Sequence, residues 1–187
     1  MKYLIAILLV TLPLSAKEFH VDRQADNLVK FISETTVESF KGITDQIDGY
    51  AYYEDDSLTL NSEFYFEVEL ATIETGIGLR DRHMRDNYLE TDSFPYASYK
   101  GNITNAKVVT ADSIQVETSG EFTIHGVTQQ RDIPGTLVRT DSGWLVRAEF
   151  IVNLNDHDIK IPKVMFLKLA ETQTVVVEFY VKPAGEK

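Results

Sequence analysis

The sequence predicts an all-β protein in which about eight strands form an elongated antiparallel barrel, with one short helix inserted between two of them. Three observations point to this fold: long stretches in which apolar and polar residues alternate, turn signals between these stretches, and a single stretch with helical spacing. Successive side chains of a strand point to opposite faces of a sheet, so each alternating stretch has one apolar and one polar face. Closing such a sheet into a barrel pairs its edge strands.

The clearest alternation is LTLNSEFYFEVEL at residues 58–70. Its apolar phase consists of Leu58, Leu60, Phe64, Phe66, Val68 and Leu70, interrupted only by Ser62. At about 3.3 Å per residue, one strand over this stretch reaches about 40 Å, whereas a usual strand has about 5–6 residues. A strand of this length needs neighbours of similar length, and the rest of the chain offers them.

Strands are expected at 18–22, 27–37 and 42–53 before this stretch. In 27–37 the alternation places Leu28 and Ile32 on one face and Val29 and Phe31 on the other. The polar cluster EDDS at 54–57 is typical of a turn.

The stretch TGIGLRDRHMRDNY at 75–88 has helical spacing, since Leu79 and His83 lie four residues apart, as do Met84 and Tyr88. Pro95 favours an extended conformation at Phe94 and ends this segment. Turn clusters at 110–113 and 140–143 separate the following stretches. Further strands are expected at 96–109, 114–128, 133–139, 144–154 and 174–181.

The first residues, MKYLIAILLVTLPLSA, predict a secretory signal peptide that is cleaved after Ala16. Its apolar run is too short to span a bilayer, and no other run approaches that length, so no stable membrane insertion is expected. Cysteine is absent, which excludes disulfides and a lipid anchor on an N-terminal cysteine. We therefore expect one domain over 17–187, located in the periplasm or secreted.

The formal net charge of −11 becomes −12 when Lys2 is removed with the signal peptide. Proteins that bind a phosphate backbone are basic, so nucleic acid is disfavoured as a partner, and so is passive adhesion to an anionic membrane. The acidity is explained by solubility.

Three features occur in order along the chain: Val21-Asp22 in a strand after the signal peptide, TGIGLRDRHMRDNYLETDSFPYASY at 75–99, and GEFTIHGVTQQRDIP at 120–134. With these features the chain resembles the YceI-like family of secreted bacterial proteins across nearly its whole mature length. The resemblance implies a lipocalin-like, elongated eight-stranded antiparallel barrel. It also implies a long hydrophobic tunnel that holds an isoprenoid or a similar amphiphile.

One departure from the family pattern lies in the segment DRQADN at 22–27, where many members have His-Ser shortly after Val-Asp. If that pair contacts the ligand, the head-group preference differs here.

The apolar phases supply candidate residues for the lining of a tunnel. From the alternation alone, a filled barrel core explains these residues better than a tunnel does; the family resemblance favours the tunnel. The candidates are Phe31, Leu60, Phe64, Phe66, Val116, Phe122, Ile124, Trp144, Val146, Phe150, Val177 and Phe179.

Arg80, Arg82 and His125 are candidates for contacts to a polar head group at the tunnel mouth. The arginines alternate with Asp81 and Asp86, so a solvated helix face with internal ion pairs explains them more simply. His125 precedes Gly126, which suggests a bend in which the imidazole satisfies backbone groups.

No cofactor and no metal are expected. In Asp156-His157-Asp158, three consecutive residues cannot all point at one ion, and no second ligand pair lies at a useful spacing. Sequence motifs of nucleophilic or phosphate-binding enzymes are also missing.

The sequence therefore predicts a non-enzymatic protein that carries or sequesters an isoprenoid-type lipid or quinone. One alternative is an enzyme that acts on a lipidic substrate inside the barrel, with His125 or His157 as the base. Another is a ligand-free barrel that serves as an interaction module for an envelope partner. The sequence leaves a homodimer open.

Overall fold

The computed structural model describes residues 16–34, 39–54, 57–161, 163–164, 167–168 and 170–185. Its strands are β1 (Ala16–Val21), β2 (Leu28–Glu34), β3 (Ser39–Thr44), β4 (Ile47–Glu54), β5 (Glu63–Glu69), β6 (Tyr96–Thr110), β7 (Ser113–Ile124), β8 (Val127–Thr140), β9 (Gly143–Asn153), β10 (Lys163–Val164), β11 (Leu167–Lys168) and β12 (Thr172–Pro183). Its helical segments are α1 (Gly78–Met84), the π-helical turn η2 (Arg85–Leu89), and the 3₁₀ turns η1 (Leu70–Thr72) and η3 (Leu154–His157).

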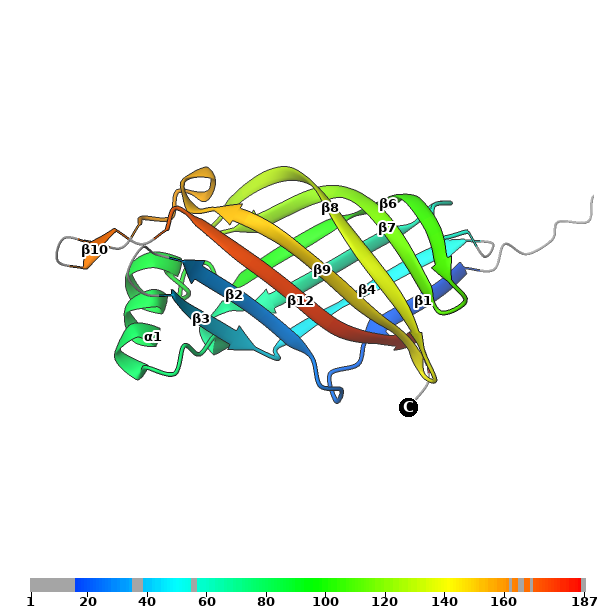
Figure 1. Cartoon of the computed structure of the whole chain (residues 1–187), viewed down its shortest axis with the longest axis horizontal. Helices are drawn as coiled ribbons and strands as arrows, with labels where there is room; N and C mark the ends of the chain where they lie inside the picture. Colours follow the sequence, from blue (N-terminus) through cyan, green and yellow to red (C-terminus); the bar gives the residue numbers. More distant parts are fainter. Residues whose placement is uncertain are drawn as a thin grey trace, which may run out of the picture.

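The strands form a closed antiparallel barrel. The pairing order is β1-β4-β5-β6-β7-β8-β9-β12, and β12 pairs back with β1, which closes a ring of eight strands. The predicted fold class, an eight-stranded antiparallel barrel with one short inserted helix, is thus confirmed. The body is elongated, with α1 at one end and the C-terminal end of β12 near the other (Figure 1).

The β2–β3 hairpin extends this ring at the end that carries α1. Along one edge of β12, residues 181–183 pair with β1 and residues 173–178 pair with β2. β3 then pairs with β2, and Ile43 bridges to Glu74 in the segment before α1. β1 and β2 therefore occupy consecutive parts of the same edge.

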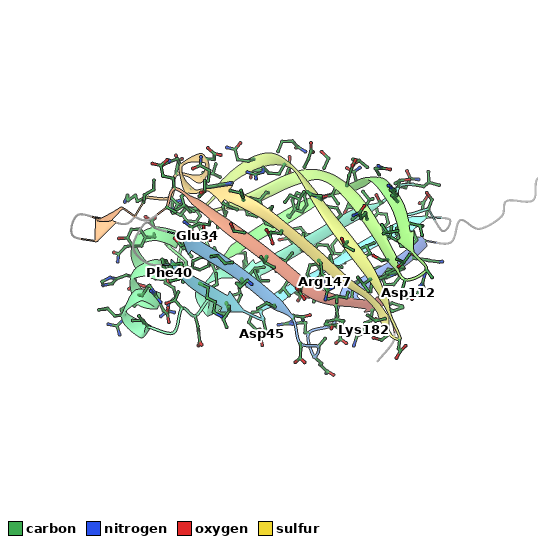
Figure 2. All side chains as sticks on the ribbon, in the orientation of Figure 1. Glu34, Phe40, Asp45, Asp112, Arg147 and Lys182 are labelled. Carbon is green, nitrogen blue, oxygen red and sulfur yellow. The ribbon has the colours of Figure 1, made fainter. Side chains whose placement is uncertain are left out.

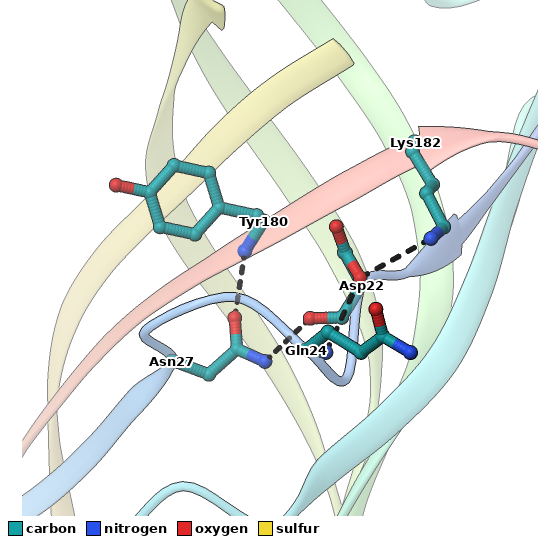
Figure 3. A network of polar contacts seen from close by, with 5 residues as sticks. All are labelled: Asp22, Gln24, Asn27, Tyr180 and Lys182. Carbon is teal, nitrogen blue, oxygen red and sulfur yellow. Dashed lines mark hydrogen bonds and ion pairs between the residues drawn. The ribbon is translucent and has the colours of Figure 1, made fainter. Parts of the chain in front are cut away.

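A polar network closes the gap between β1 and β2 (Figure 3). The backbone N–H of Tyr180 donates to Asn27 Oδ1 at 3.0 Å, and Asn27 Nδ2 donates to the Asp22 carbonyl at 2.9 Å. The carboxylate of Asp22 accepts bonds from the Gln24 backbone N–H and from the Lys182 ammonium, each at 3.2 Å. The buried Asn27 amide thus replaces the strand partner that β12 lacks at this point.

The strand predicted over 58–70 is shorter than expected, since β5 covers only Glu63–Glu69. Before it, the chain folds back: Leu60 N–H donates to the Ser57 carbonyl, and Leu60 O accepts from Glu54 N–H. Asn61 has φ 47°, in the left-handed region, so the alternation does not continue through this turn. The predicted 40 Å strand is wrong, although β6, β7 and β8 have 15, 12 and 14 residues.

Two other predicted strands are each divided by a tight turn. The stretch 42–53 contains β3 and β4, separated at Asp45 and Gln46, where Thr44 Oγ1 accepts from the Gln46 N–H at 3.0 Å. The stretch 114–128 contains β7 and the start of β8, separated at His125 and Gly126, whose φ angles are 54° and 73°.

The predicted helix over 75–88 is present in part. Regular α-helix covers α1, and one π-helical turn continues it to Leu89. In the described part of the chain, no helix has both the length and the apolar character needed to cross a membrane. The predicted signal peptide lies outside the described residues, except for Ala16, which begins β1.

Candidate functional site

The barrel encloses a cavity of about 680 Å³. Protein interiors normally contain few voids larger than one water molecule, whereas ligand sites typically measure about 300–1,000 Å³. The cavity wall is overwhelmingly apolar and extends from Leu79 of α1 to Leu58 near the opposite end. The interior is therefore hollow over much of its length, while a packed core of Phe19, Ile47, Trp144 and neighbouring residues lies where β1, β9 and β12 meet.

All of the predicted tunnel residues except Leu60 line this cavity. Leu60 points away because of the turn before β5, and 45% of it is exposed. Contact of the other residues with a ligand remains a prediction. The residues on the wall are Phe31, Phe64, Phe66, Val116, Phe122, Ile124, Trp144, Val146, Phe150, Val177 and Phe179.

Aromatic rings make continuous contacts along one side of the wall. Phe64 lies 5.7 Å from Phe66 and 5.1 Å from Tyr99, and Phe66 lies 4.7 Å from Phe179, measured between ring centroids. These spacings are typical of favourable ring pairs. The rings therefore pack against one another, and the surface that is not used in these contacts lines the cavity.

Small residues keep the middle of the barrel open. In the register of the sheet, Gly135 of β8 pairs with Val116 of β7 and with Ala148 of β9, and Ala148 also pairs with Val177 of β12. All four residues line the cavity. Two of the four consecutive positions thus carry almost no side chain.

Several polar side chains on the wall have partners within the protein. Tyr99 donates to the Arg131 carbonyl at 3.0 Å, and Thr118 Oγ1 donates to the Ile133 carbonyl at 2.6 Å. Burial raises the pKa of Tyr99, so its hydroxyl stays neutral at physiological pH. Ser62 Oγ accepts from the Ile103 N–H at 2.9 Å.

Ser33 and Gln173 differ from these residues. Both line the cavity, and Ser33 is 1% exposed and Gln173 8% exposed. Yet Ser33 Oγ and Gln173 Oε1 have no hydrogen-bond partner among the described residues. Neither residue was predicted from the sequence as part of the cavity wall. A signal was present, because Ser33 continues the face of Val29 and Phe31 on β2.

The mouth near α1 is built around Thr75. Asp81 accepts bonds from the backbone N–H and the hydroxyl of Thr75, and Arg80 donates to the hydroxyl and the carbonyl of the same residue. These contacts fix the loop before α1 and place the Arg80 guanidinium 4.4 Å from the centre of the Phe40 ring. Of the predicted head-group residues, only Arg80 lines the cavity.

Arg82 and His125 lie outside the cavity wall. Arg82 is exposed, because the wall is formed by the helix face that carries Leu79 and His83, whereas Arg82 projects from another face. His125 occupies the β7–β8 turn, where its Nδ1 donates to the His157 carbonyl at 3.1 Å and its ring packs against Phe94. Its predicted contact to a ligand head group therefore has no support in the geometry.

His157 is fully buried behind the wall and does not line the cavity. Its Nδ1 donates to the Val127 carbonyl at 3.0 Å, and its ring packs edge-on against Phe122 at 5.4 Å. Neither histidine proposed as a base thus faces the cavity. Among the residues that the structure describes, no cluster of three or more acidic or histidine side chains could hold a metal ion.

The segment 22–27, where the sequence departs from the family pattern, does not line the cavity either. It serves the junction between β1 and β2 (Figure 3).

Comparisons with known proteins agree with this architecture. A family model described as the YceI-like domain matches residues 19–182. A polyisoprenoid binding domain from Saccharophagus degradans, implicated in plant cell wall breakdown, superposes with a TM-score of 0.71 at 18% identity, over 88% of this chain and 98% of that one. BcnA of Burkholderia cenocepacia superposes with a TM-score of 0.69 at 12% identity, over 85% and 98% of the two chains.

The YceI protein of Campylobacter jejuni is also similar, with a TM-score of 0.61 at 12% identity over 82% of this chain and 90% of that one. A search of curated proteins finds no match. At these identities the structural likeness establishes the fold, while the family model covers most of the sequence. The chain belongs to the family of YceI-like domains.

Proposed function

We propose that this protein binds an isoprenoid-type lipid or a quinone in the barrel cavity and carries or sequesters it in the periplasm or outside the cell. The observation that carries the proposal is the apolar cavity of about 680 Å³ inside a closed barrel. A filled barrel, the basis of the ligand-free alternative, would not contain such a space. The similar polyisoprenoid binding domain from Saccharophagus degradans supports the same class of ligand.

Burial of the apolar tail supplies the driving force. A prenyl segment that loses about 300 Å² of apolar surface to the cavity gains roughly 7 kcal/mol, at about 25 cal/mol per Å². The loss of translational freedom and the ordering of the tail reduce this gain. Stable binding therefore requires most of the tail to lie inside the wall, and the length of the cavity, from Leu79 to Leu58, favours an elongated ligand.

The geometry favours a binding role over catalysis. The two histidines considered as bases, His125 and His157, bind backbone carbonyls and do not line the cavity. On the wall, the hydroxyls of Tyr99 and Thr118 already donate to backbone carbonyls of the protein. The wall thus offers apolar contact rather than a nucleophile with an adjacent base.

Mass spectrometry of the ligand tests this proposal. The protein is purified without detergent from the envelope and secreted fractions of its own cell, then extracted with organic solvent. A stoichiometric prenyl lipid or quinone is expected in the extract. An empty extract, together with failure of the purified protein to take up a fluorescent apolar probe, would contradict the proposal.

The location is tested on the same material. The mass of the intact polypeptide is expected to correspond to a chain that begins at Lys17. Recovery of the uncleaved chain from the cytoplasm would overturn the proposed location and leave the ligand to be judged from the extract.

A further inference from the structure

The pair Ser33 and Gln173 marks one level of the cavity as chemically different from the rest. The two residues face each other in register on the neighbouring strands β2 and β12. The next cavity-facing pairs of the same two strands are Phe31 with Val175 and Val29 with Val177, which are apolar. A single polar pair therefore interrupts an otherwise apolar β2–β12 wall.

The orientation of the Gln173 amide is fixed by the protein. Its Nε2 donates to the Ala170 carbonyl at 3.0 Å. A flipped amide would bring two oxygen atoms together, because a backbone carbonyl only accepts hydrogen bonds. The free atom of the side chain is thus Oε1, which can only accept.

Both free atoms are buried beyond the reach of bulk solvent. Within the part of the chain that the structure describes, Ser33 Oγ and Gln173 Oε1 are both buried and neither has a hydrogen-bond partner. Buried polar atoms are normally hydrogen-bonded, and leaving them unpaired destabilises the folded state. Other cavity-facing hydroxyls, such as that of Thr118, are satisfied by backbone groups. The Ser33–Gln173 pair is therefore suited to a group that enters the cavity from outside.

The chemistry of the two atoms defines that group. Gln173 Oε1 needs a hydrogen-bond donor, while the Ser33 hydroxyl can donate or accept. A hydroxyl group meets both demands, since it can donate to Gln173 and accept from Ser33. The carbonyl oxygens of a quinone and the oxygens of an ionised phosphate only accept, so they would leave Gln173 Oε1 unpaired.

We propose that the lipid held in this cavity carries a hydroxyl group, which donates a hydrogen bond to Gln173 Oε1 and accepts one from Ser33 Oγ. This inference rests on the proposed function and names the polar group of its ligand. Phe40, which pairs with Ser33 in register, lies beneath the Arg80 guanidinium at the end of the barrel that carries α1 (Figure 2). The hydroxyl therefore lies near this end, and the tail runs toward Leu58.

Two matched pairs of ligands test the proposal. The protein is stripped of lipid on an apolar resin, and affinities are measured by displacement of a fluorescent apolar probe. The first pair is geranylgeraniol and its methyl ether, which share the tail and differ in the donor. The second pair is a prenylated hydroquinone and its quinone. We expect the alcohol to bind about tenfold more tightly than its ether, because the ether leaves Gln173 Oε1 unpaired.

The quinone pair identifies the source of the hydroxyl. If the hydroquinone also binds about tenfold more tightly than its quinone, the hydroxyl can belong to a reduced quinone as well as to a prenyl alcohol. A preference seen only in the first pair would restrict it to the alcohol. Both results support a hydroxyl at this level of the cavity.

Substitutions assign the preference to the two residues. The double variant S33A/Q173L is expected to bind the alcohol and the ether with equal affinity. Its affinity for the ether should be at least as high as that of the natural protein. Thr174→Val is the matched control, because Thr174 neighbours Gln173 on β12 but does not line the cavity. It should retain the tenfold preference.

Three results would overturn the inference. Equal affinities of the alcohol and its ether for the natural protein would show that no donor is recognised, while leaving the lipid-binding function intact. Tightest binding of geranylgeranyl diphosphate would assign the head group to Arg80 instead. A preference that persists in the double variant would place the polar contact elsewhere. Displacement of the probe by none of these ligands would reject the proposed function itself.

Discussion

Filling the middle of the barrel should abolish ligand uptake without unfolding the protein. Ala148 lines the cavity beside Gly135, at a level where the wall carries little side-chain volume. An Ala148→Phe substitution places a phenyl ring into this space. A cavity of about 150 Å³ accommodates one benzene molecule, so the ring occupies about a fifth of the 680 Å³ available.

The loss of affinity follows from the contact area that the ring takes over. A phenylalanine side chain buries at least about 150 Å², and a displaced ligand segment loses contact area of the same order. At about 25 cal/mol per Å² this amounts to roughly 4 kcal/mol, or several hundredfold in the dissociation constant. Because the new ring enters an existing space, the melting temperature should stay the same or rise.

Displacement of a fluorescent apolar probe and thermal unfolding measure the two effects. Ile151→Phe is the matched control, because it adds a phenylalanine to the outer face of the same strand, where 56% of Ile151 is exposed. The control should bind like the natural protein. Unchanged uptake by Ala148→Phe would refute a binding site inside the barrel, and loss of folding in this variant would show that the interior is already packed.

Three further predictions concern barrel residues that do not line the cavity. His157→Ala should lower the free energy of unfolding by about 3 kcal/mol, because it removes a buried ring and leaves the Val127 carbonyl unpaired. A decrease of less than about 1 kcal/mol in the free energy of unfolding, measured by urea titration, would contradict this. Tyr65, whose pKa is raised to about 12 by its hydrogen bond to Glu67, binds its proton more tightly in the folded state, so its contribution to stability declines between about pH 10 and 12. Ultraviolet titration should show this late ionisation, and Glu67→Gln should move it toward pH 10; no movement would reject the proposed cause. Gly120→Ala should destabilise the protein by about 2 kcal/mol, because its Cβ would lie 2.3 Å from a carbonyl oxygen of β6. An unchanged melting temperature would refute this close approach of β6 and β7.

The barrel and most of its wall could be predicted from the sequence, because alternation is a local property of each strand. The inward phase of β9, with Trp144, Val146 and Phe150, is the same in the sequence and in the structure. The turn at His125 and Gly126 was missed because the sequence after it carries no clear phase. Ile124 and Val127 pair across this turn, so the inward residues change from even-numbered in β7 to odd-numbered in β8, and the five polar residues at 128–132 hide the change. The usual signals for such a turn are Asn-Gly and Asp-Gly, and neither occurs there.

The polar pair of the cavity was missed for a related reason. A search for apolar residues assigns Ser33 and Gln173 to gaps or turns, although each lies at an inward position of its strand. Their proximity depends on the register of β2 with β12, and these strands are far apart in the sequence. Only the pairing of the strands shows that two isolated polar residues form one site.

The same dependence on register explains why alternation alone does not separate a hollow barrel from a filled one. Both have the same inward phases; they differ in which inward residues meet at one level. Here Gly135 meets Ala148, and neither fills the space between Val116 and Val177. If β8 were shifted by two residues against β9, Ile133 or Leu137 would take the place of Gly135 beside Ala148, with the alternation unchanged. The cavity is therefore a property of how the strands are paired, and binding in this fold depends on residues whose contribution is their small size.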